Sequence, residues 1–349
     1  MKTQIIKISP ENFSEEELAS AAQVIKSGGL VIFPTETVYG LGADGTSASA
    51  ASKIYSAKGR PSDNPLIIHV ASPDDAAKYT YTNETYDILA KKFMPGPLTV
   101  VLPAKTIIPM ETRAGLPTVA VRCPSHPIAN TLIKLSGVPI AAPSANLSGS
   151  PSPTKASHVI DDMCGRVDMI IDGGDSEVGL ESTIVKIEDD GEVLLLRPGK
   201  ITIEDLAAVC PRIKIADAVT EQLKAGETVL SPGMKYKHYA PKAPVCLIDG
   251  DIKNTVSYIA QRAKKRSVAV LCYESDIETL KKEIPDVFIY EFGDADDESH
   301  QAHILFDILR DTDKHNFDEI YAPLPRKEGI GLALYNRMIR AAAYHIIRL

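Results

Sequence analysis

The sequence predicts an α/β protein that is built from two domains. At 349 residues the chain is too long for one ordinary hydrophobic core. Predicted strands and helices alternate irregularly up to residue 210, which favours a mixed rather than a purely parallel sheet. From residue 244 onward strands and helices alternate regularly, which predicts a smaller parallel α/β domain. We therefore expect domains at residues 1–210 and 244–349, joined by a linker at residues 211–243.

The first helix has clear start and stop signals. Ser14 and Glu17 have the spacing of a capping box, in which each side chain bonds the backbone N–H of the other residue. Apolar residues then recur on one face, and Gly28-Gly29 ends the helix. A short buried strand is expected directly afterwards, at residues 30–33.

The remainder of the first domain follows the same kinds of signal. Helices are expected at residues 48–57, 85–93 and 127–135. Strands are expected at residues 66–70, 98–102, 118–122, 139–142, 167–171, 182–187 and 192–196, with little helix among the last three. Two loops rich in hydroxyl and amide groups follow strands, at residues 34–42 and 143–149.

The second domain shows regular βα alternation. Strands are expected at residues 245–248, 268–272, 287–290 and 319–322, and helices at residues 255–264, 277–282, 301–309 and 333–346. It has no glycine-rich phosphate loop, so we assign it no catalytic role.

Composition excludes several classes of protein. The net charge of -8 argues against binding of nucleic acid through bulk charge, although it does not exclude a local basic patch. The five cysteines are far apart and form no CxxC pair, which predicts free, buried thiols in a reducing compartment and no zinc site. No signal peptide or apolar run long enough to span a membrane is evident, so we expect a cytoplasmic protein that makes no membrane contact.

One stretch, Lys58–Pro65, combines two cations with helix-breaking residues. Lys58 and Arg60 flank a glycine between a predicted helix and a predicted strand. Open α/β sheets bind ligands at strand ends, and a lysine with an arginine suits a polyphosphate. From this stretch alone, a solvated surface loop explains the residues equally well.

Common catalytic motifs are absent or out of context. Gly40–Gly45 matches GxGxxG, but six residues separate it from the preceding strand, so a nicotinamide or flavin enzyme is rejected. There is no GxxxxGK[ST] motif, and no histidine has a motif that links it to a nucleophile. Glu36 and Glu181 are candidate acids or bases, but spacing alone does not pair them.

A set of cationic and hydroxyl residues nevertheless falls at or just beyond predicted strand ends. It comprises Thr35, Lys58, Arg60, Arg122, Ser144, Asn146, Ser182 and Arg197. A cleft lined by these groups suits an anionic ligand such as a nucleotide. The residues alone therefore predict a phosphate-binding cleft and do not identify a reaction.

Several motifs together resemble the YrdC/Sua5 family of L-threonylcarbamoyladenylate synthases. They are residues 34–42, 58–60, 64–66, 95–99, 142–146 and 181–184, in the order typical of that family. Lys58, Arg60, Ser144 and Asn146 match its KxR…SxN signature. The resemblance extends over a YrdC-like catalytic domain, a linker like that of the long Sua5 form, and a Sua5 C-terminal domain. It implies a twisted mixed sheet with a positive cleft in the first domain and a Rossmann-like second domain.

The resemblance also implies a reaction and its partners. L-threonine, bicarbonate and ATP would give threonylcarbamoyl-AMP and pyrophosphate, with Mg²⁺ held by the ATP phosphates and by no protein ligand. The product would supply the N6-threonylcarbamoyl modification of adenosine 37 in tRNA, made by a separate complex of the TsaD/TsaB/TsaE type.

Residue roles follow from the same resemblance. The signature residues Lys58, Arg60, Ser144 and Asn146 would be catalytic. ATP would contact Lys58, Ser62, Thr118, Ser144, Ser152, Arg197 and Tyr236. Threonine would contact Thr35, Ile67, His69, Arg122, Ala142 and Ser182. Tyr236 lies in the linker, which we expect to close over the cleft as a lid.

Two other functions remain open at this point. The cleft could instead hold RNA directly, although the acidic overall charge counts against this. A related carbamoyl-transfer domain occurs in hydrogenase maturation proteins, but the acylphosphatase and zinc-finger segments of those proteins are not seen in this sequence.

Overall fold

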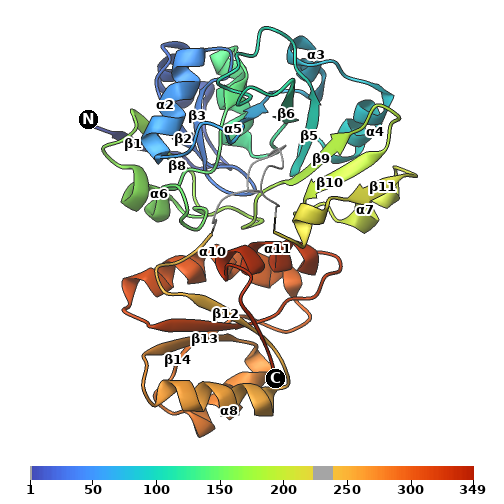
Figure 1. Ribbon diagram of the computed structural model, residues 1–349. Helices are drawn as coiled ribbons and strands as arrows, with labels where there is room; N and C mark the ends of the chain where they lie inside the picture. Colours follow the sequence, from blue (N-terminus) through green and yellow to red (C-terminus); the bar gives the residue numbers. More distant parts are fainter. Residues whose placement is uncertain (1, 223–238) are drawn as a thin grey trace. The chain divides into compact units, whose positions relative to one another are not determined.

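The computed structural model describes residues 2–222 and 239–349 (Figure 1). Within these ranges the chain forms two compact units. The first holds residues 2–148 and 152–222, and the second holds residues 149–151 and 239–349.

The first unit is organised around one sheet. In chain order its strands are β1 (Gln4–Lys7), β2 (Val31–Phe33), β3 (Gly40–Asp44), β4 (Ile67–His69), β5 (Leu98–Pro103), β6 (Thr118–Arg122), β7 (Ile140–Ala141), β8 (Met169–Asp172), β9 (Thr183–Ile187), β10 (Val193–Arg197) and β11 (Ile213–Ile215). They lie in the order β1-β8-β2-β3-β7-β4-β6-β5-β9-β10-β11. Strands β4 and β6 are parallel and β5 and β6 antiparallel, so the prediction of a mixed sheet is confirmed.

Helices cover this sheet (Figure 1). They are α1 (Glu15–Lys26), α2 (Ala48–Lys58), α3 (Ala76–Tyr79), α4 (Glu84–Phe93), α5 (Pro127–Ser136), α6 (Ala156–Met163) and α7 (Ile203–Ala207), with 3-10 turns at Pro73–Asp75 and Asp217–Val219. Helices α1 and α5 pack side by side over β2 and β8. Leu18, Ile25, Leu132 and Val31 form part of the core beneath them. This burial anchors the strand that leads into the first polar loop.

The N-terminus of α1 differs from the sequence prediction. Ser14 is the N-cap residue, but its side chain makes no capping hydrogen bond, so the predicted capping box is not formed. The helix ends at Lys26, and Gly28 follows in the left-handed region at φ 74°. Glycine adopts this conformation without the steric cost that a side chain would impose.

The prediction of a loop throughout residues 34–42 is wrong at its last three residues, because Gly40–Asp44 forms strand β3. This strand pairs antiparallel with β2. A Cβ atom at Gly42 would lie 2.7 Å from both Phe33 Cε1 and Ile140 Cγ2. Glycine is therefore required because a neighbouring strand packs its aromatic ring against the backbone, and not because a dinucleotide approaches it.

Other elements were absent from the sequence prediction. Helix α6 precedes β8, and the short strand β1 pairs with β8 at the sheet edge. Strand β11 lies within the predicted linker and extends the sheet by pairing with β10. The first sheet thus continues beyond Cys210.

The second unit contains a smaller sheet whose strands are all parallel, as predicted. The strands are β12 (Val245–Asp249), β13 (Val268–Cys272), β14 (Phe288–Glu291), β15 (Glu319–Pro323) and β16 (Ile346–Arg348), in the order β14-β13-β15-β12-β16. The helices are α8 (Ile252–Ala263), α9 (Ile277–Glu283), α10 (Glu298–Asp311) and α11 (Gly331–Ala341), with 3-10 turns at Glu274–Asp276 and Thr312–Lys314. The prediction of a helix up to residue 346 is wrong, because α11 ends at Ala341 and β16 follows.

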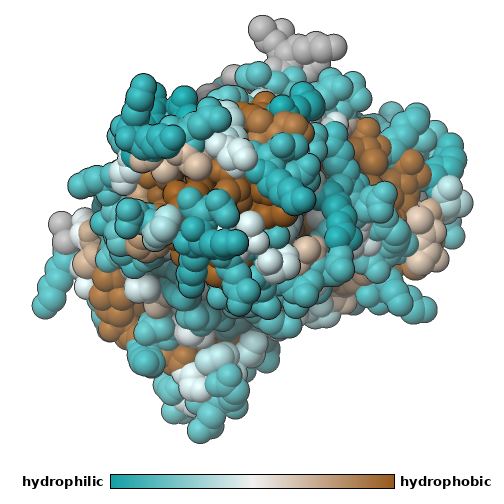
Figure 2. Space-filling view, turned by 90° about the horizontal axis from the view of Figure 1, so that it is seen from below, coloured by the Kyte–Doolittle hydropathy of each residue, from teal (hydrophilic) through white to brown (hydrophobic). Residues whose placement is uncertain are grey.

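The cysteines are free thiols, as the composition predicts, with one exception in their burial. All five cysteines are free thiols and four are buried, but Cys164 is exposed. No helix within the described ranges is long and apolar enough to cross a membrane. On the face shown in Figure 2, hydrophilic side chains dominate and smaller apolar areas lie between them, which is normal for a protein surface.

Candidate active site

Four of the residues predicted to bind substrates share one face of the first sheet. Ile67 and His69 lie on β4, and Thr118 and Arg122 lie on β6. His69 is the register partner of Arg122, and Ile67 that of Ala120. Because side chains two residues apart point to the same face of a strand, all four project from the same side. Thr118 and Arg122 are separated by about 13 Å along β6, so they belong to opposite ends of this face.

Arg122 is held by three polar contacts from two loops. Its Nη2 lies 2.8 Å from Glu36 Oε1, its Nη1 donates to Thr37 Oγ1 at 2.9 Å, and its Nε donates to the Gly96 carbonyl at 3.4 Å. The contact with Glu36 is an ion pair by distance, although its angle is outside that of a well-formed hydrogen bond. Both side chains are almost fully buried. Arg122 is therefore a fixed cation at the end of β6.

Glu36 remains ionised in this buried position. Burial alone raises the pKa of a carboxyl group, but the adjacent charge of Arg122 and backbone hydrogen bonds such as that from Ser125 N outweigh it and lower the pKa of Glu36. Its second oxygen, Oε2, is buried and accepts no hydrogen bond from the described residues. The sequence named Glu36 as a candidate acid or base; its lowered pKa fits a charge partner better.

His69 is neutral in the folded protein. Burial, and next the charge of Arg122, lower its pKa to about 3. Its Nδ1 lies 3.2 Å from the Ile140 carbonyl, and its ring packs edge-on against Phe33. It therefore contributes shape and hydrogen bonding to the site, and no charge at neutral pH.

The turn after β2 is fixed by the hydroxyl of Thr35. This oxygen donates to the Val38 carbonyl at 2.6 Å and is approached by the backbone N–H groups of Thr37 and Val38, each at 3.2 Å. The turn holds the Thr37 hydroxyl on Arg122. Thr35 thus has a structural task beside any contact with substrate.

Lys58 is the last residue of α2 and is buried, which corrects the expectation that it lies on a loop. Its Nζ donates to the carbonyl and the side-chain oxygen of Asn146 at 2.6 and 3.2 Å, and it also contacts the Ser144 carbonyl. The Ser144 hydroxyl donates to Asn146 Oδ1. Gly59 follows in the left-handed conformation and ends the helix. Three of the four signature residues therefore form one cluster, in which the lysine holds the second polar loop.

The other residues of the Lys58–Pro65 stretch are arranged differently. Arg60 is half-buried and donates from Nη2 to the carbonyls of Asn64 and Pro65, at 3.3 and 3.2 Å. Ser62 is exposed. Arg60 thus stabilises its own loop.

Ser182 and Arg197 form a further cluster at the ends of β9 and β10. Arg197 donates from Nε to the Ser182 carbonyl at 3.1 Å and from Nη2 to Ser182 Oγ at 3.2 Å. Next to it, Ser152 donates to Glu181 Oε1 at 2.5 Å, and both side chains are buried. The predicted threonine-binding and ATP-binding residues are therefore in direct contact at this point.

Backbone hydrogen bonds join these clusters. Tyr39 accepts from Ala145 N at 2.8 Å and donates to the Pro153 carbonyl at 2.9 Å, which ties the first polar loop to the second. Val178 N donates to the Glu36 carbonyl at 2.8 Å. Ala142 N donates to the Ile67 carbonyl at 2.9 Å, so the predicted Ala142 contact also lies beside β4. The two polar loops that the sequence indicated are therefore joined to each other, and the second one begins beside β4.

Some predicted residues lie apart or outside the described ranges. Tyr236 and the central part of the predicted linker, residues 223–238, lie outside the residues that the structure describes. Tyr239 is described, and its ring stacks on Phe306 of α10 with centroids 5.1 Å apart, inside the second unit. The sequence analysis assigned no role to Thr37 or Thr99. The Thr37 hydroxyl contacts Arg122, and the Thr99 hydroxyl contacts Ser182. Thr99 lies in residues 95–99, one of the stretches that resemble the family.

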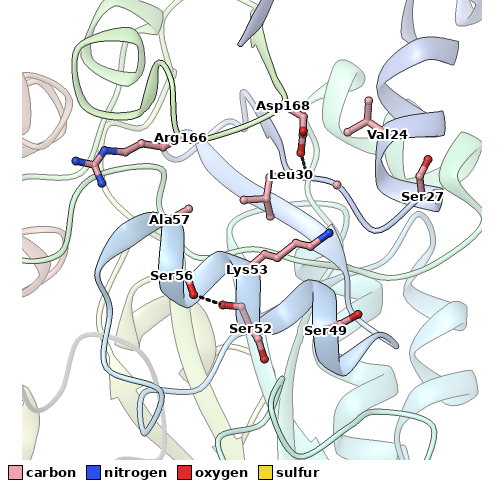
Figure 3. Close-up of a pocket in the computed structure, with 11 residues that line it drawn as sticks. Val24, Ser27, Leu30, Ser49, Ser52, Lys53, Ser56, Ala57, Arg166 and Asp168 are labelled. Carbon is pink, nitrogen blue, oxygen red and sulfur yellow. Dashed lines mark hydrogen bonds between the residues drawn. The ribbon is translucent and has the colours of Figure 1, made fainter. Parts of the chain in front are cut away.

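A groove of about 840 Å³ lies elsewhere on the first unit, between the C-terminal part of α1, α2 and the segment before β8 (Figure 3). None of the predicted site residues lines it. The ammonium of Lys53 donates to the Gly28 carbonyl at 2.6 Å, and Asp168 accepts from Leu30 N. The polar groups that line the groove are thus largely engaged in hydrogen bonds within the fold. We therefore do not assign the reaction to this groove.

Comparison with known proteins identifies the family. A family model for Sua5, YciO and YrdC proteins, described as telomere recombination, matches residues 23–199. A second model, the C-terminal domain of threonylcarbamoyl-AMP synthase, matches residues 201–343. The chain belongs to the Sua5/YrdC family. The resemblance seen in the sequence motifs is thereby confirmed.

Full-length relatives have the same organisation. The threonylcarbamoyl-AMP synthase of Pyrococcus abyssi is 42% identical over 347 residues, with 97% of each chain covered. That of Bacillus subtilis is 43% identical over 340 residues, covering 96% of this chain and 95% of the relative. A crystal structure of Pyrococcus abyssi Sua5 in complex with L-threonine superposes with a TM-score of 0.90 at 41% identity, covering 99% of this chain and all of the other.

Proposed function

We propose that the protein is a threonylcarbamoyl-AMP synthase, which converts L-threonine, bicarbonate and ATP into threonylcarbamoyl-AMP and pyrophosphate. The observation that carries the proposal is full-length similarity to synthases of that name, together with the threonine complex of Pyrococcus abyssi Sua5. The clustered cations and hydroxyls on one sheet face supply the binding groups that such substrates need.

The chemistry requires positioning more than a reactive side chain. The threonine amine and bicarbonate combine to a carbamate with loss of water. A carbamate oxygen then attacks the α-phosphorus of ATP, and the bond to the β-phosphate oxygen breaks to release pyrophosphate. Holding the two reactants together and stabilising the phosphoryl charge accelerates such a step without a protein nucleophile.

We assign the amino acid to the Arg122 end of the sheet face. Arg122 supplies a fixed cation for the carboxylate, with Thr35, Ile67, His69, Ala142 and Ser182 around it. Because His69 is neutral, it does not compete with Arg122 for that carboxylate. Burial of these groups excludes water, which strengthens the charge interaction.

We assign ATP to the cluster around Lys58. Lys58, Arg60, Ser144 and Asn146 are proposed to act on the phosphates, and Ser62, Thr118, Ser152 and Arg197 to contact the nucleotide. Tyr236 is assigned to the same subsite. Mg²⁺ is proposed to arrive bound to the ATP phosphates. Among the described residues, no group of three or more His, Cys, Asp or Glu side chains is arranged to hold a metal. The cationic and hydroxyl side chains of this cluster are of the kind that bind phosphate.

The product is a carbamoyl–phosphate mixed anhydride. Such an anhydride reacts readily with water, so an acceptor must consume it. We propose that it supplies the threonylcarbamoyl group of N6-threonylcarbamoyladenosine at position 37 of tRNA, through a TsaD/TsaB/TsaE-type complex in the cytoplasm. Direct contact with RNA would have to rely on a local basic patch, because the chain is acidic overall.

Pyrophosphate release tests the proposal. Purified protein with ATP, Mg²⁺, L-threonine and bicarbonate should release pyrophosphate, and omission of threonine or bicarbonate should abolish it. Lys58→Met should be inactive, whereas Lys53→Met should be active, because the Lys53 ammonium lies on the same helix but bonds the Gly28 carbonyl. Pyrophosphate release that is independent of threonine would contradict the proposal.

A further inference from the structure

Thr99 and Ser182 form a buried pair of hydroxyls beside the proposed amino-acid subsite. Thr99 is on β5 and fully buried, and its Oγ1 lies 2.8 Å from Ser182 Oγ. In the β5–β6 ladder Thr99 is directly opposite Arg122, so their Cβ atoms are about 5 Å apart. The pair therefore links Ser182 to the cation that is proposed to hold the substrate carboxylate.

The direction of this hydrogen bond follows from the available partners. Ser182 Oγ accepts from Arg197 Nη2 at 3.2 Å, because a guanidinium can only donate. Within the described part of the chain, Ser182 Oγ is the sole hydrogen-bond partner of the Thr99 hydroxyl. A buried hydroxyl that fails to donate is costly, and with an acceptor oxygen in the proposed subsite both protons are donated only if Thr99 donates to Ser182 and Ser182 donates to that oxygen.

Both lone pairs of Ser182 Oγ are then occupied. One accepts from Arg197 and the other from Thr99, which leaves only the proton of Ser182 itself for a new contact. Such a hydroxyl binds a carboxylate or another acceptor oxygen, and it rejects an ammonium group. Thr99 thus determines which end of a zwitterionic amino acid Ser182 can bind.

We propose that Thr99 is a positioning residue that makes Ser182 an obligatory donor to the carboxylate of the amino-acid substrate, beside Arg122. This inference rests on the proposed function. Arg122 and Ser182 together provide two donors to one carboxylate, one of them charged. Thr99 does not touch the substrate, and it acts only through the orientation of the Ser182 hydroxyl.

Isosteric replacement of Thr99 tests the inference. Thr99→Val removes the hydroxyl and keeps the volume. We expect the Kd for L-threonine, measured by calorimetry, to rise about three- to tenfold, the range of one ordinary hydrogen bond. The Kd for L-threoninol, which lacks the carboxylate, and the KM for ATP should stay within about twofold. Thr99→Ser keeps a hydroxyl at this position and should retain the affinity for threonine. If the valine variant is unstable, Thr99→Ala replaces it as the variant without a hydroxyl.

The matched control is Thr112→Val. Thr112 is also fully buried, and its hydroxyl donates to the Gly45 carbonyl at 2.9 Å. This variant tests a purely structural loss and should leave the ratio of the two Kd values unchanged. An unchanged Kd for threonine in Thr99→Val, or equal losses for threonine and threoninol, would overturn the inference.

The outcome also separates this inference from the proposed function. If Arg122→Ala weakens threonine binding and Thr99→Val does not, only the role of Thr99 is refuted. If the unaltered protein binds no threonine, the proposed function fails and the inference fails with it.

Discussion

Breaking the buried ion pair between Glu36 and Arg122 should destabilise the first unit strongly. Glu36→Ala leaves the Arg122 guanidinium almost fully buried without its carboxylate. Removal of one partner from a buried pair costs about 3–5 kcal/mol. For a unit of this size each kcal/mol lowers Tm by about 2–4 °C, so a decrease of about 6–20 °C is expected. Differential scanning calorimetry at pH 7 measures this change.

Glu36→Gln separates charge from shape. Glutamine can still accept the hydrogen bond from Ser125 N but carries no charge. Glu36→Gln should therefore lower Tm less than Glu36→Ala does. Because the folded-state pKa of Glu36 is lowered, its ionisation stabilises the protein above the unfolded pKa of about 4.3, and this stability is lost as the pH falls through the folded-state value. The difference in Tm between the original protein and Glu36→Gln should therefore be largest near neutral pH and shrink in acid.

An exposed ion pair provides the control. Glu15 lies 3.4 Å from Lys134, and both side chains are more than half exposed. Glu15→Ala should cost less than about 1 kcal/mol, as surface pairs do. If Glu36→Ala shifts Tm no more than Glu15→Ala, the account of Arg122 as a cation fixed by Glu36 is refuted.

Three further predictions concern the site. Lys58→Met should abolish pyrophosphate release. It should also speed amide hydrogen exchange at residues 145–148, because the Lys58 ammonium holds that loop. A variant with full activity and protected amides would refute this. 2-Aminobutyrate should have a kcat/KM at least about 100-fold below that of threonine, because a site that hydrogen-bonds the substrate hydroxyl rejects an analogue without it. Equal kcat/KM values would show that the hydroxyl is not recognised. His69 should remain neutral at pH 5, as measured by nitrogen NMR. The imidazole of the unfolded chain takes up a proton below a pH of about 6.5, so His69 lowers the free energy of unfolding as the pH falls. A measured His69 pKa near 6.5 would contradict its burial.

Elements with strong periodicity could be predicted from the sequence, and elements formed by tertiary packing could not. The strands at residues 118–122 and 268–272 were predicted with the observed bounds, because both are runs of β-branched and apolar residues. Strand β3 was missed because Gly40 and Gly42 have low strand propensity, and only the packed ring of Phe33 explains them. The end of α11 was missed because Ala341 is followed by further helix-favouring residues, although Ala343 and Tyr344 take the left-handed conformation.

The candidate site shows the same division. The sequence indicated the polar loops at strand ends, since the types of residue and their placement are local features. It did not indicate that Glu36 pairs with Arg122 or that Thr99 contacts Ser182, because these contacts depend on which strands are neighbours and in which register. It also placed Lys58 on a loop, whereas the helix includes the lysine and ends only at Gly59, in the left-handed conformation.

The most direct test of the proposed function follows the bicarbonate carbon. Purified protein is incubated with ATP, Mg²⁺, L-threonine and ¹³C-bicarbonate, and the nucleotide products are analysed by mass spectrometry. We predict an adenylate that contains threonine and carries the label in its carbamoyl group, formed in step with pyrophosphate. Pyrophosphate without a labelled threonine adduct, or no turnover of ATP at all, would contradict the proposed reaction.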